Sequence, residues 1–255
     1  MLAKYTGPVT SLLAAILLAA AASVSVKATD GRAVAATFAG ASKTPAPAVL
    51  LIAEEGRGRA DWEATAARLA DAGVAALAIE VRATPKDPAQ AAPDIAGALA
   101  WLRKQPSVDP AHILLAGAGV PALSALVSAS IDDKVAGLAL ISSPLKSGEL
   151  DGMSTLGIYG ARPLFVAVGR GDKAAAKAAL VFDGSAQGTH KIHLAKGGGR
   201  GARLLAGDPD ALGAFVDWIR ETSGLASPEI TPTGQKIEAP ATPVPTCPGD
   251  AKKCG

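Results

Sequence analysis

Mostly apolar runs alternate along the chain with stretches in which apolar residues recur every three or four positions. The runs predict buried strands, at residues 48–53, 74–80, 113–116, 135–141, 163–168 and 191–195. The helical spacing predicts helices between and after them, over residues 62–73, 95–102, 123–127, from 172 onward, and over 212–219. Strands that are apolar on both faces and alternate with helices predict a parallel sheet that helices cover on both sides.

Two short strands, residues 23–29 and 32–38, are predicted to precede these units and to pair with each other. The dipeptide Asp30-Gly31 stands between them and is a strong signal for a tight hairpin turn. The predicted fold class is therefore α/β, with a doubly wound, mostly parallel sheet and an antiparallel hairpin at its N-terminus. The pattern covers residues 23–224, a length at which α/β folds often form a single domain.

The first residues predict an export signal. Lys4 precedes an apolar run over residues 12–22. At about 1.5 Å per residue this run reaches roughly half of a bilayer core of about 30 Å, which argues against a membrane span. Three alanines, residues 20–22, offer a small-residue cleavage site. We therefore expect residues 1–22 to be a cleaved signal peptide of a periplasmic or secreted protein; an uncleaved N-terminal anchor and an ordinary first helix are the alternatives.

The last residues, 225–255, are rich in proline and poor in large apolar side chains. This composition is typical of an extended spacer outside the core, and it does not identify a protein partner. Cys247 and Cys254, the only cysteines, lie in this tail, and in an oxidising compartment they are expected to form a disulfide. Free thiols are the alternative, and a metal site is disfavoured because no histidine lies nearby.

The overall composition fits a globular protein, with 49% hydrophobic and 19% charged residues. Aromatic residues make up only 4%, so the core must be built from small and aliphatic side chains. A formal net charge of +2 gives no reason to expect a nucleic-acid partner.

Residues 109–121 carry a family resemblance. They contain an Asp-Pro entry, an apolar strand and the sequence Gly-Ala-Gly-Val-Pro. This order resembles the approach to the nucleophile elbow, G-x-S-x-G, of dienelactone-hydrolase-like α/β-hydrolases. Further segments resemble the oxyanion loop, the next strand, the acid turn, the histidine loop and the closing helix of that family, at residues 47–62, 75–82, 163–172, 194–201 and 216–220. The resemblance covers about residues 24–224 and implies an α/β-hydrolase fold without an evident lid.

The triad that the resemblance implies is incomplete. Gly119 stands at the nucleophile position, and glycine has no side-chain atom that could attack a carbonyl. Arg200 stands at the histidine position, and a guanidinium that stays protonated cannot be a general base. Asp172 matches the acid, while Pro121 replaces the last glycine of the elbow and is expected to alter its path. The sequence therefore predicts a catalytically degenerate hydrolase; the alternative is an active esterase or dienelactone-type hydrolase that uses other residues.

Other serines and histidines are poor substitutes for the missing groups. Those weighed are Ser124, Ser142, Ser143, His112, His190 and His193. Helix packing and turn formation before a proline explain the serines. The histidines precede or lie on strands, whose geometry directs them away from the histidine loop.

A ligand site is predicted around the former catalytic position. Its expected binding residues are Glu55, Gly56, Val120 and Arg203. The amide of Val120 follows the nucleophile position and matches an oxyanion-hole donor, whereas Glu55 is an acid or base of the oxyanion loop or an ordinary surface glutamate. Backbone amides of the glycine-rich residues 196–203, with Arg200 and Arg203, could bind an anion; a flexible loop is the alternative. We expect a small anionic or acyl ligand.

No cofactor or metal is predicted. Residues 117–122 also match G-x-G-x-x-A, a dinucleotide-binding pattern. However, residues 140–143 hold no ribose-binding carboxylate about twenty positions later, and several strands precede this one. Dinucleotide binding is therefore disfavoured.

Overall fold

The computed structural model describes residues 21–197 and 199–225. The predicted cleavage site begins at residue 20, and nearly all of the predicted signal peptide lies outside this range. The tail after Leu225, with Cys247 and Cys254, also lies outside the described residues. The expectations for these segments stay predictions.

The described chain forms an eight-stranded sheet with the order β1-β2-β4-β3-β5-β6-β9-β10. Its strands are β1 (Ala22–Lys27), β2 (Ala33–Ala39), β3 (Ala46–Ile52), β4 (Ala75–Ile79), β5 (Val108–Ala118), β6 (Val135–Ile141), β9 (Leu164–Gly169) and β10 (His190–Ala195). Six neighbouring strands of this sheet are parallel to one another: β4, β3, β5, β6, β9 and β10. The hairpin β1–β2 joins the sheet antiparallel, through β2 and β4. The predicted fold class, including the N-terminal hairpin, is confirmed.

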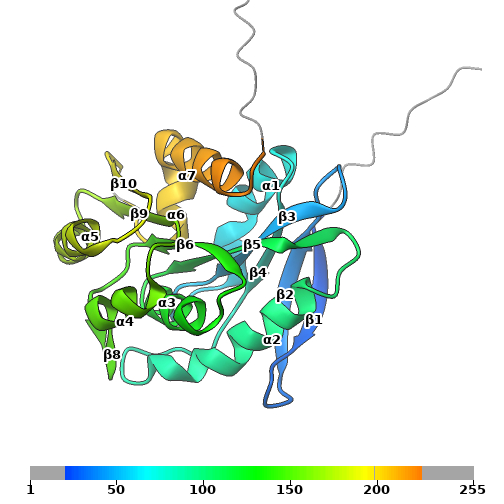
Figure 1. Cartoon of the computed structure of the whole chain (residues 1–255), viewed down its shortest axis with the longest axis horizontal. Coiled ribbons are helices and arrows are strands. Elements are labelled where there is room, and N and C mark those ends of the chain that lie inside the picture. The colour runs from blue at the N-terminus through cyan, green and yellow to red at the C-terminus, as the bar shows by residue number, and fades with distance from the viewer. Residues whose placement is uncertain (1–20, 198, 226–255) are drawn as a thin grey trace, which may run out of the picture.

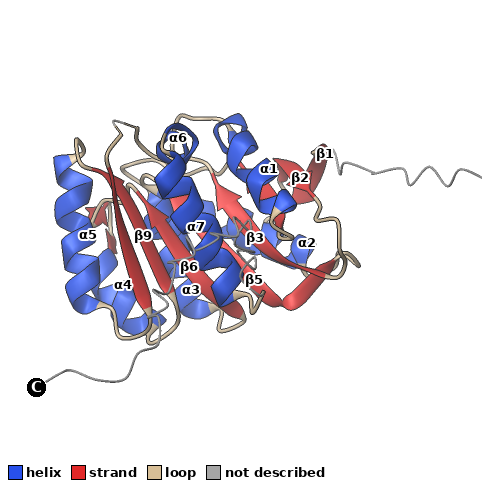
Figure 2. Ribbon diagram, turned by 90° about the horizontal axis from the view of Figure 1, so that it is seen from above, coloured by secondary structure: helices blue, strands red, loops and turns tan. Residues whose placement is uncertain are grey.

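Helices cover both faces of this sheet (Figures 1 and 2). The helices are α1 (Glu63–Asp71), α2 (Ala92–Leu102), α3 (Pro121–Ile131), α4 (Gly152–Tyr159), α5 (Lys173–Ser185), α6 (Ala202–Gly207) and α7 (Pro209–Thr222). One apolar core lies between the sheet and α2, α3, α4 and α5. A second core lies between the other face and α1, α6 and α7. Strands β3, β4 and β9 are buried along their whole length because both of their faces are covered.

A buried ionic cluster fixes the hairpin to this framework. Asp94, on α2, is fully buried and accepts hydrogen bonds from Arg32, in the hairpin, and Arg82, after β4. Arg82 also contacts Asp30 of the hairpin turn, at 2.6 Å. These charges offset one another, which a fully buried carboxylate requires.

Several elements were not predicted. They are α4, α6, the short pair β7 (Lys146–Ser147) and β8 (Leu150–Asp151), and two 3₁₀ turns, η1 (Arg59–Trp62) and η2 (Pro88–Ala91). The fold also includes Leu225, one residue beyond the predicted boundary, because this side chain packs against the second core. None of the helices in the described part of the chain combines the length and apolar character that crossing a membrane requires.

Candidate functional site

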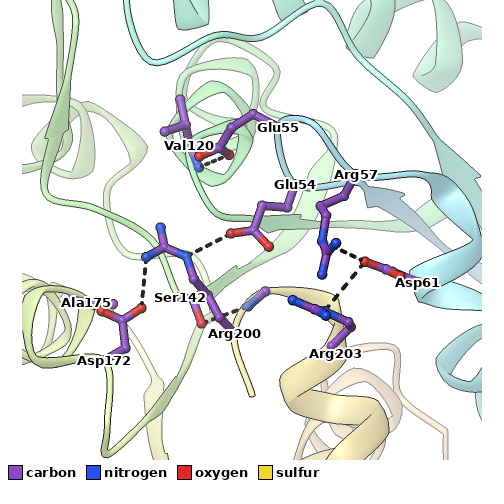
Figure 3. Close-up of polar contacts among 11 residues, drawn as sticks. Glu54, Glu55, Arg57, Asp61, Val120, Ser142, Asp172, Ala175, Arg200 and Arg203 are labelled. Atoms are coloured by element: carbon purple, nitrogen blue, oxygen red, sulfur yellow. Dashed lines mark hydrogen bonds and ion pairs between the residues drawn. The ribbon is translucent and has the colours of Figure 1, made fainter. Parts of the chain in front are cut away.

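The parallel strands end at one edge of the sheet, where open α/β sheets bind ligands. The residues that follow β3, β5, β6, β9 and β10 meet there: Glu54 and Glu55, Gly119, Ser142, Asp172 and Arg200. The structure thus brings the three predicted triad positions together. Figure 3 shows Arg200 between Asp172 and Glu54, and a Cβ on Gly119 would lie beside the same Glu54 side chain. The structure adds Glu54 and Ser142, to which sequence reasoning gave no role in a site.

The turn at Gly119 has the geometry of a sharp strand-to-helix elbow. Gly119 has a φ of +63°, a conformation that L side chains adopt rarely, and its amide donates to the carbonyl of Ile141 at 3.0 Å. A Cβ on Gly117 would lie 2.6 Å from Cα of Ala122, so glycine permits the close approach of β5 and α3. Pro121 is the first residue of α3, where its fixed φ and missing N–H are well tolerated. The expectation that Pro121 alters the path of the elbow stays a prediction.

Carboxylate side chains crowd Gly119, the predicted nucleophile position. A Cβ on Gly119 would lie 2.6 Å from Cγ of Glu54 and 2.7 Å from Oε2 of Glu55. Gly201, with a φ of +58°, approaches Glu54 from the other side, and a Cβ there would run into Oε2 of Glu54. The Glu54 side chain, only 11% exposed, therefore lies between two glycines.

Arg200 connects Glu54, after β3, with Asp172, after β9. Its Nε donates to Oε1 of Glu54 at 2.8 Å, and its Nη1 donates to Oδ2 of Asp172 at 3.2 Å. Asp172, 13% exposed, also accepts from the amide of Ala175 and so caps α5. The hydrogen bond to Glu54 and the charge of Asp172 hold the pKa of the Arg200 guanidinium above its usual value. We call these two ion pairs, Glu54–Arg200 and Arg200–Asp172, the ionic bridge. It includes the predicted acid and histidine positions of the triad.

The Val120 amide stands at the position predicted for an oxyanion-hole donor. It follows the nucleophile position and would be one oxyanion-hole donor. Here it donates to Oε2 of Glu55 at 2.9 Å, so the amide already has a carboxylate oxygen as its acceptor (Figure 3). Gly56, the next residue, has a φ of +70° and serves the turn of this loop.

The serines of the site have structural partners. Ser142 is buried, has a φ of +51°, and accepts from the amide of Gly201 at 3.0 Å. It thereby ties the loop that carries Arg200 to the end of β6. Ser124 donates to the carbonyl of Pro88 at 2.7 Å, and Ser143 donates to that of Pro144 at 3.0 Å.

The histidines make their contacts elsewhere. His112 pairs with Asp109 at 2.8 Å, before the apolar part of β5. His190 begins β10, at the opposite end of the strand from Arg200, and lies 3.2 Å from Asp183. Neither of these two contacts a residue of the ionic bridge. His193, within β10, interacts electrostatically with Asp208.

Arg203 does not join Arg200. Its Nε lies 3.9 Å from Oδ2 of Asp61, which also pairs with Arg57 at 3.3 Å (Figure 3). The two arginines of the predicted anion nest therefore face different carboxylates. Three carboxylates and one guanidinium leave the site itself with excess negative charge.

The glycines of the loop after β10 permit close packing. A Cβ on Gly169, at the end of β9, would lie 2.9 Å from the carbonyl oxygen of Gly199 and 3.2 Å from that of Gly197. The amide of Gly197 donates to Asp208 at 3.2 Å. In residues 21–197 and 199–225, no group of three or more His, Cys, Asp or Glu side chains is placed to hold a metal ion.

Comparisons with known proteins find similarity in structure. No protein family and no curated protein matches the sequence. Among solved structures, DcsB in complex with its substrate analogue has a TM-score of 0.70 at 14% identity, over 80% of this chain and 100% of that one. The carboxylesterase EstE1, from a metagenomic library, has 0.62 at 17%, over 81% and 90%. The alpha/beta hydrolase GrgF from Penicillium sp. sh18 has 0.62 at 11%, over 81% and 100%.

Proposed function

With the α/β-hydrolase fold of this chain as the premise, we propose that the protein is a catalytically degenerate hydrolase. It does not cleave esters by the serine mechanism. It binds a small ligand that carries a carboxylate, at the former oxyanion position. Export by residues 1–22, a disulfide between Cys247 and Cys254 and a spacer or partner-binding role of the tail belong to the same proposal.

The hydrogen bond between the Val120 amide and the Glu55 carboxylate carries this proposal. An oxyanion hole presents fixed donors to a developing negative oxygen. The amide of Val120 is still directed at a negative oxygen, whereas Gly119 has no nucleophilic atom and Arg200 no basic one. Anion recognition is thus the part of hydrolase chemistry for which this site retains a group.

An activity-probe experiment tests the loss of catalysis. The mature protein is treated with a fluorophosphonate and, separately, with p-nitrophenyl butyrate. We expect no labelled serine and no turnover above that of heat-denatured protein, because the site has neither nucleophile nor base. Labelling of a serine, with turnover that disappears when this serine is replaced by alanine, would contradict the proposal.

Binding is tested by titrating ¹⁵N-labelled protein with sodium acetate and, as a neutral control, with acetamide. We expect acetate to shift the amide resonance of Val120 in a saturable way and acetamide to have little effect. No shift of Val120 with acetate, in the native protein or in Glu55→Ala, would refute the proposed ligand class.

An active hydrolase with other residues is the second candidate, and one observation favours it. Ser142 is a non-glycine residue with φ of +51° in the site, and strained residues of this kind cluster at functional sites. In that case Ser142→Ala would abolish an ester turnover that the native protein has. Ser143→Ala is the matched control.

A further inference from the structure

The former catalytic position has no space for an added anion. The Glu54 and Glu55 side chains lie within 2.6–2.7 Å of the place where a Cβ on Gly119 would stand. A Cβ atom essentially never approaches other atoms so closely, so even this one carbon atom would require the two side chains to move. A ligand oxygen on the Val120 amide must therefore displace a group that is already there.

Charge leads to the same requirement. Glu54, Glu55 and Asp172 surround the site, and Arg200 is the cation that pairs with two of them. An anion added to these groups would be repelled, whereas one that takes the place of a carboxylate leaves the local charge unchanged. Exchange is thus favoured over addition on electrostatic as well as steric grounds.

The two glutamates differ in how firmly they are held. Glu54 is largely buried between Gly119 and Gly201 and makes a charge-assisted hydrogen bond to Arg200. Glu55 is half-buried, and within residues 21–197 and 199–225 its hydrogen bond is the one from the Val120 amide. Gly56, the next residue, is exposed. Glu55 would therefore lose a hydrogen bond from a neutral donor, whereas Glu54 would lose one from a cation, and Glu55 lies beside an exposed residue.

We propose that Glu55 is an internal, autoinhibitory occupant of the ligand site, and that a ligand carboxylate replaces it on the Val120 amide. The inference rests on the proposed function and adds its regulation. The Glu54–Arg200–Asp172 bridge stays in place during the exchange and sets the ligand class. A monoanionic carboxylate replaces Glu55 charge for charge, while a phosphate dianion adds a negative charge beside Glu54.

The exchange has a quantitative consequence. The apparent dissociation constant equals the intrinsic one divided by the fraction of protein in which the amide is free. Removing the competing carboxylate raises this fraction toward one. If Glu55 occupies the amide about nine-tenths of the time, its removal strengthens ligand binding about tenfold.

The test is an NMR titration of the native protein, Glu55→Ala and Asp71→Ala with sodium acetate, followed through the Val120 amide. Asp71 ends α1 beyond the opposite edge of the sheet, so its replacement is a matched control for the loss of one negative charge. We expect Glu55→Ala to bind acetate about tenfold more tightly than the native protein and Asp71→Ala to bind it equally well. We also expect sodium phosphate to bind more weakly than acetate.

The outcomes separate the two proposals. If the native protein and Glu55→Ala bind acetate with equal affinity through Val120, the autoinhibitory role of Glu55 is wrong and the proposed ligand site stands. If acetate shifts Val120 in neither protein, the proposed function is wrong, and the inference with it. The free proteins give a second check, because loss of the hydrogen bond from the Val120 amide must move its proton resonance upfield in Glu55→Ala.

Discussion

At the scale of single residues, the proposed loss of serine catalysis rests on Gly119 and Arg200, which keep the local geometry of the site. Gly119 keeps the positive φ of an elbow, and Arg200 reaches the same aspartate that would orient a histidine. The side chains of Glu54 and Glu55, after β3, occupy the space into which a side chain at position 119 would extend. Under the proposed function, the obstacle to catalysis is therefore the occupied space as well as the two substitutions.

Restoring the triad alone should therefore restore little activity. We expect Gly119→Ser with Arg200→His to have feeble activity on p-nitrophenyl butyrate, because Glu54 and Glu55 crowd a new Cβ and the Val120 donor is taken. Adding Glu54→Ala and Glu55→Ala should raise kcat/KM by about a hundredfold, the effect of one oxyanion donor. Adding Pro121→Gly instead should have little effect, since Pro121 suits the start of α3. Ordinary enzyme rates in the double variant would contradict this account.

Arg200 should also contribute to stability. Arg200→Ala leaves the carboxylates of Glu54 and Asp172, 11% and 13% exposed, without their cation. We expect it to lower the free energy of unfolding by about 1–3 kcal/mol in urea denaturation. Arg203→Ala is the matched control: Arg203 is 56% exposed and 3.9 Å from Asp61, so its loss should cost less than about 0.5 kcal/mol. Equal effects of the two substitutions would show that the ionic bridge does not stabilise the fold.

At the scale of elements, α2 and α7 contain glycines with opposite roles. A Cβ on Gly97, in α2, would lie 2.7 Å from Cα of Ala28, so glycine lets the helix approach the hairpin. Nothing lies within 4 Å of a Cβ on Gly213, in α7. We expect Gly97→Ala to destabilise the protein by about 1–3 kcal/mol and Gly213→Ala to stabilise it by about 0.5–1 kcal/mol. Urea denaturation measures both, and a loss of stability in Gly213→Ala would refute the second expectation.

Asp208 links α7 to the glycine loop of the site. The amides of Ala211 and Gly197 donate to its carboxylate and hold its pKa below the usual value of 3.8. A carboxyl whose pKa is lowered in the folded protein stabilises the fold above its unfolded pKa. That contribution is lost as the pH falls from 3.8 through the folded pKa.

The side chain of Asp208→Asn still caps the helix but does not titrate. We therefore expect the thermal midpoint of the native protein to fall more steeply below pH 3.8 than the thermal midpoint of this variant. Thermal unfolding between about pH 7 and about pH 2.5 measures the difference. Other carboxyls with lowered pKa values, such as Asp109, are common to both proteins. Parallel curves would show that Asp208 does not contribute to the acid sensitivity.

At the scale of the whole molecule, the described residues pack on the two sides of the sheet in two apolar cores. Leu225, the last of the described residues, packs against the second core. We expect deletion of residues 226–255 to change the melting temperature by only a few degrees, because this segment has little apolar area to bury. Deletion from residue 225 should cost more, since Leu225 leaves the second core. A collapse of folding in the shorter deletion would mean that the tail packs on the domain.

Local patterns were sufficient for much of this molecule. The hairpin follows from Asp30-Gly31, and the buried strands follow from continuous apolar runs. Helix α4 was missed because its apolar residues form no clear stripe; its N-cap, Asp151, was the available signal. The position of Arg203 was also missed, because its partner Asp61 lies far away in the sequence.

Sequence alone determined that Gly119 cannot attack a carbonyl and that Arg200 cannot act as a general base, because both capacities depend on the residue type. It also determined the order of the main strands and of the helices with a clear apolar stripe, since periodicity is a property of neighbouring residues. Only the tertiary structure decided what stands in place of the triad. Glu54 and Arg200 are 146 residues apart, and Glu55 and Val120 are 65 apart. These groups meet because the parallel strands that precede them end at a common edge of the sheet. Largely buried charges there require partners, and no local sequence pattern shows which residues these partners are.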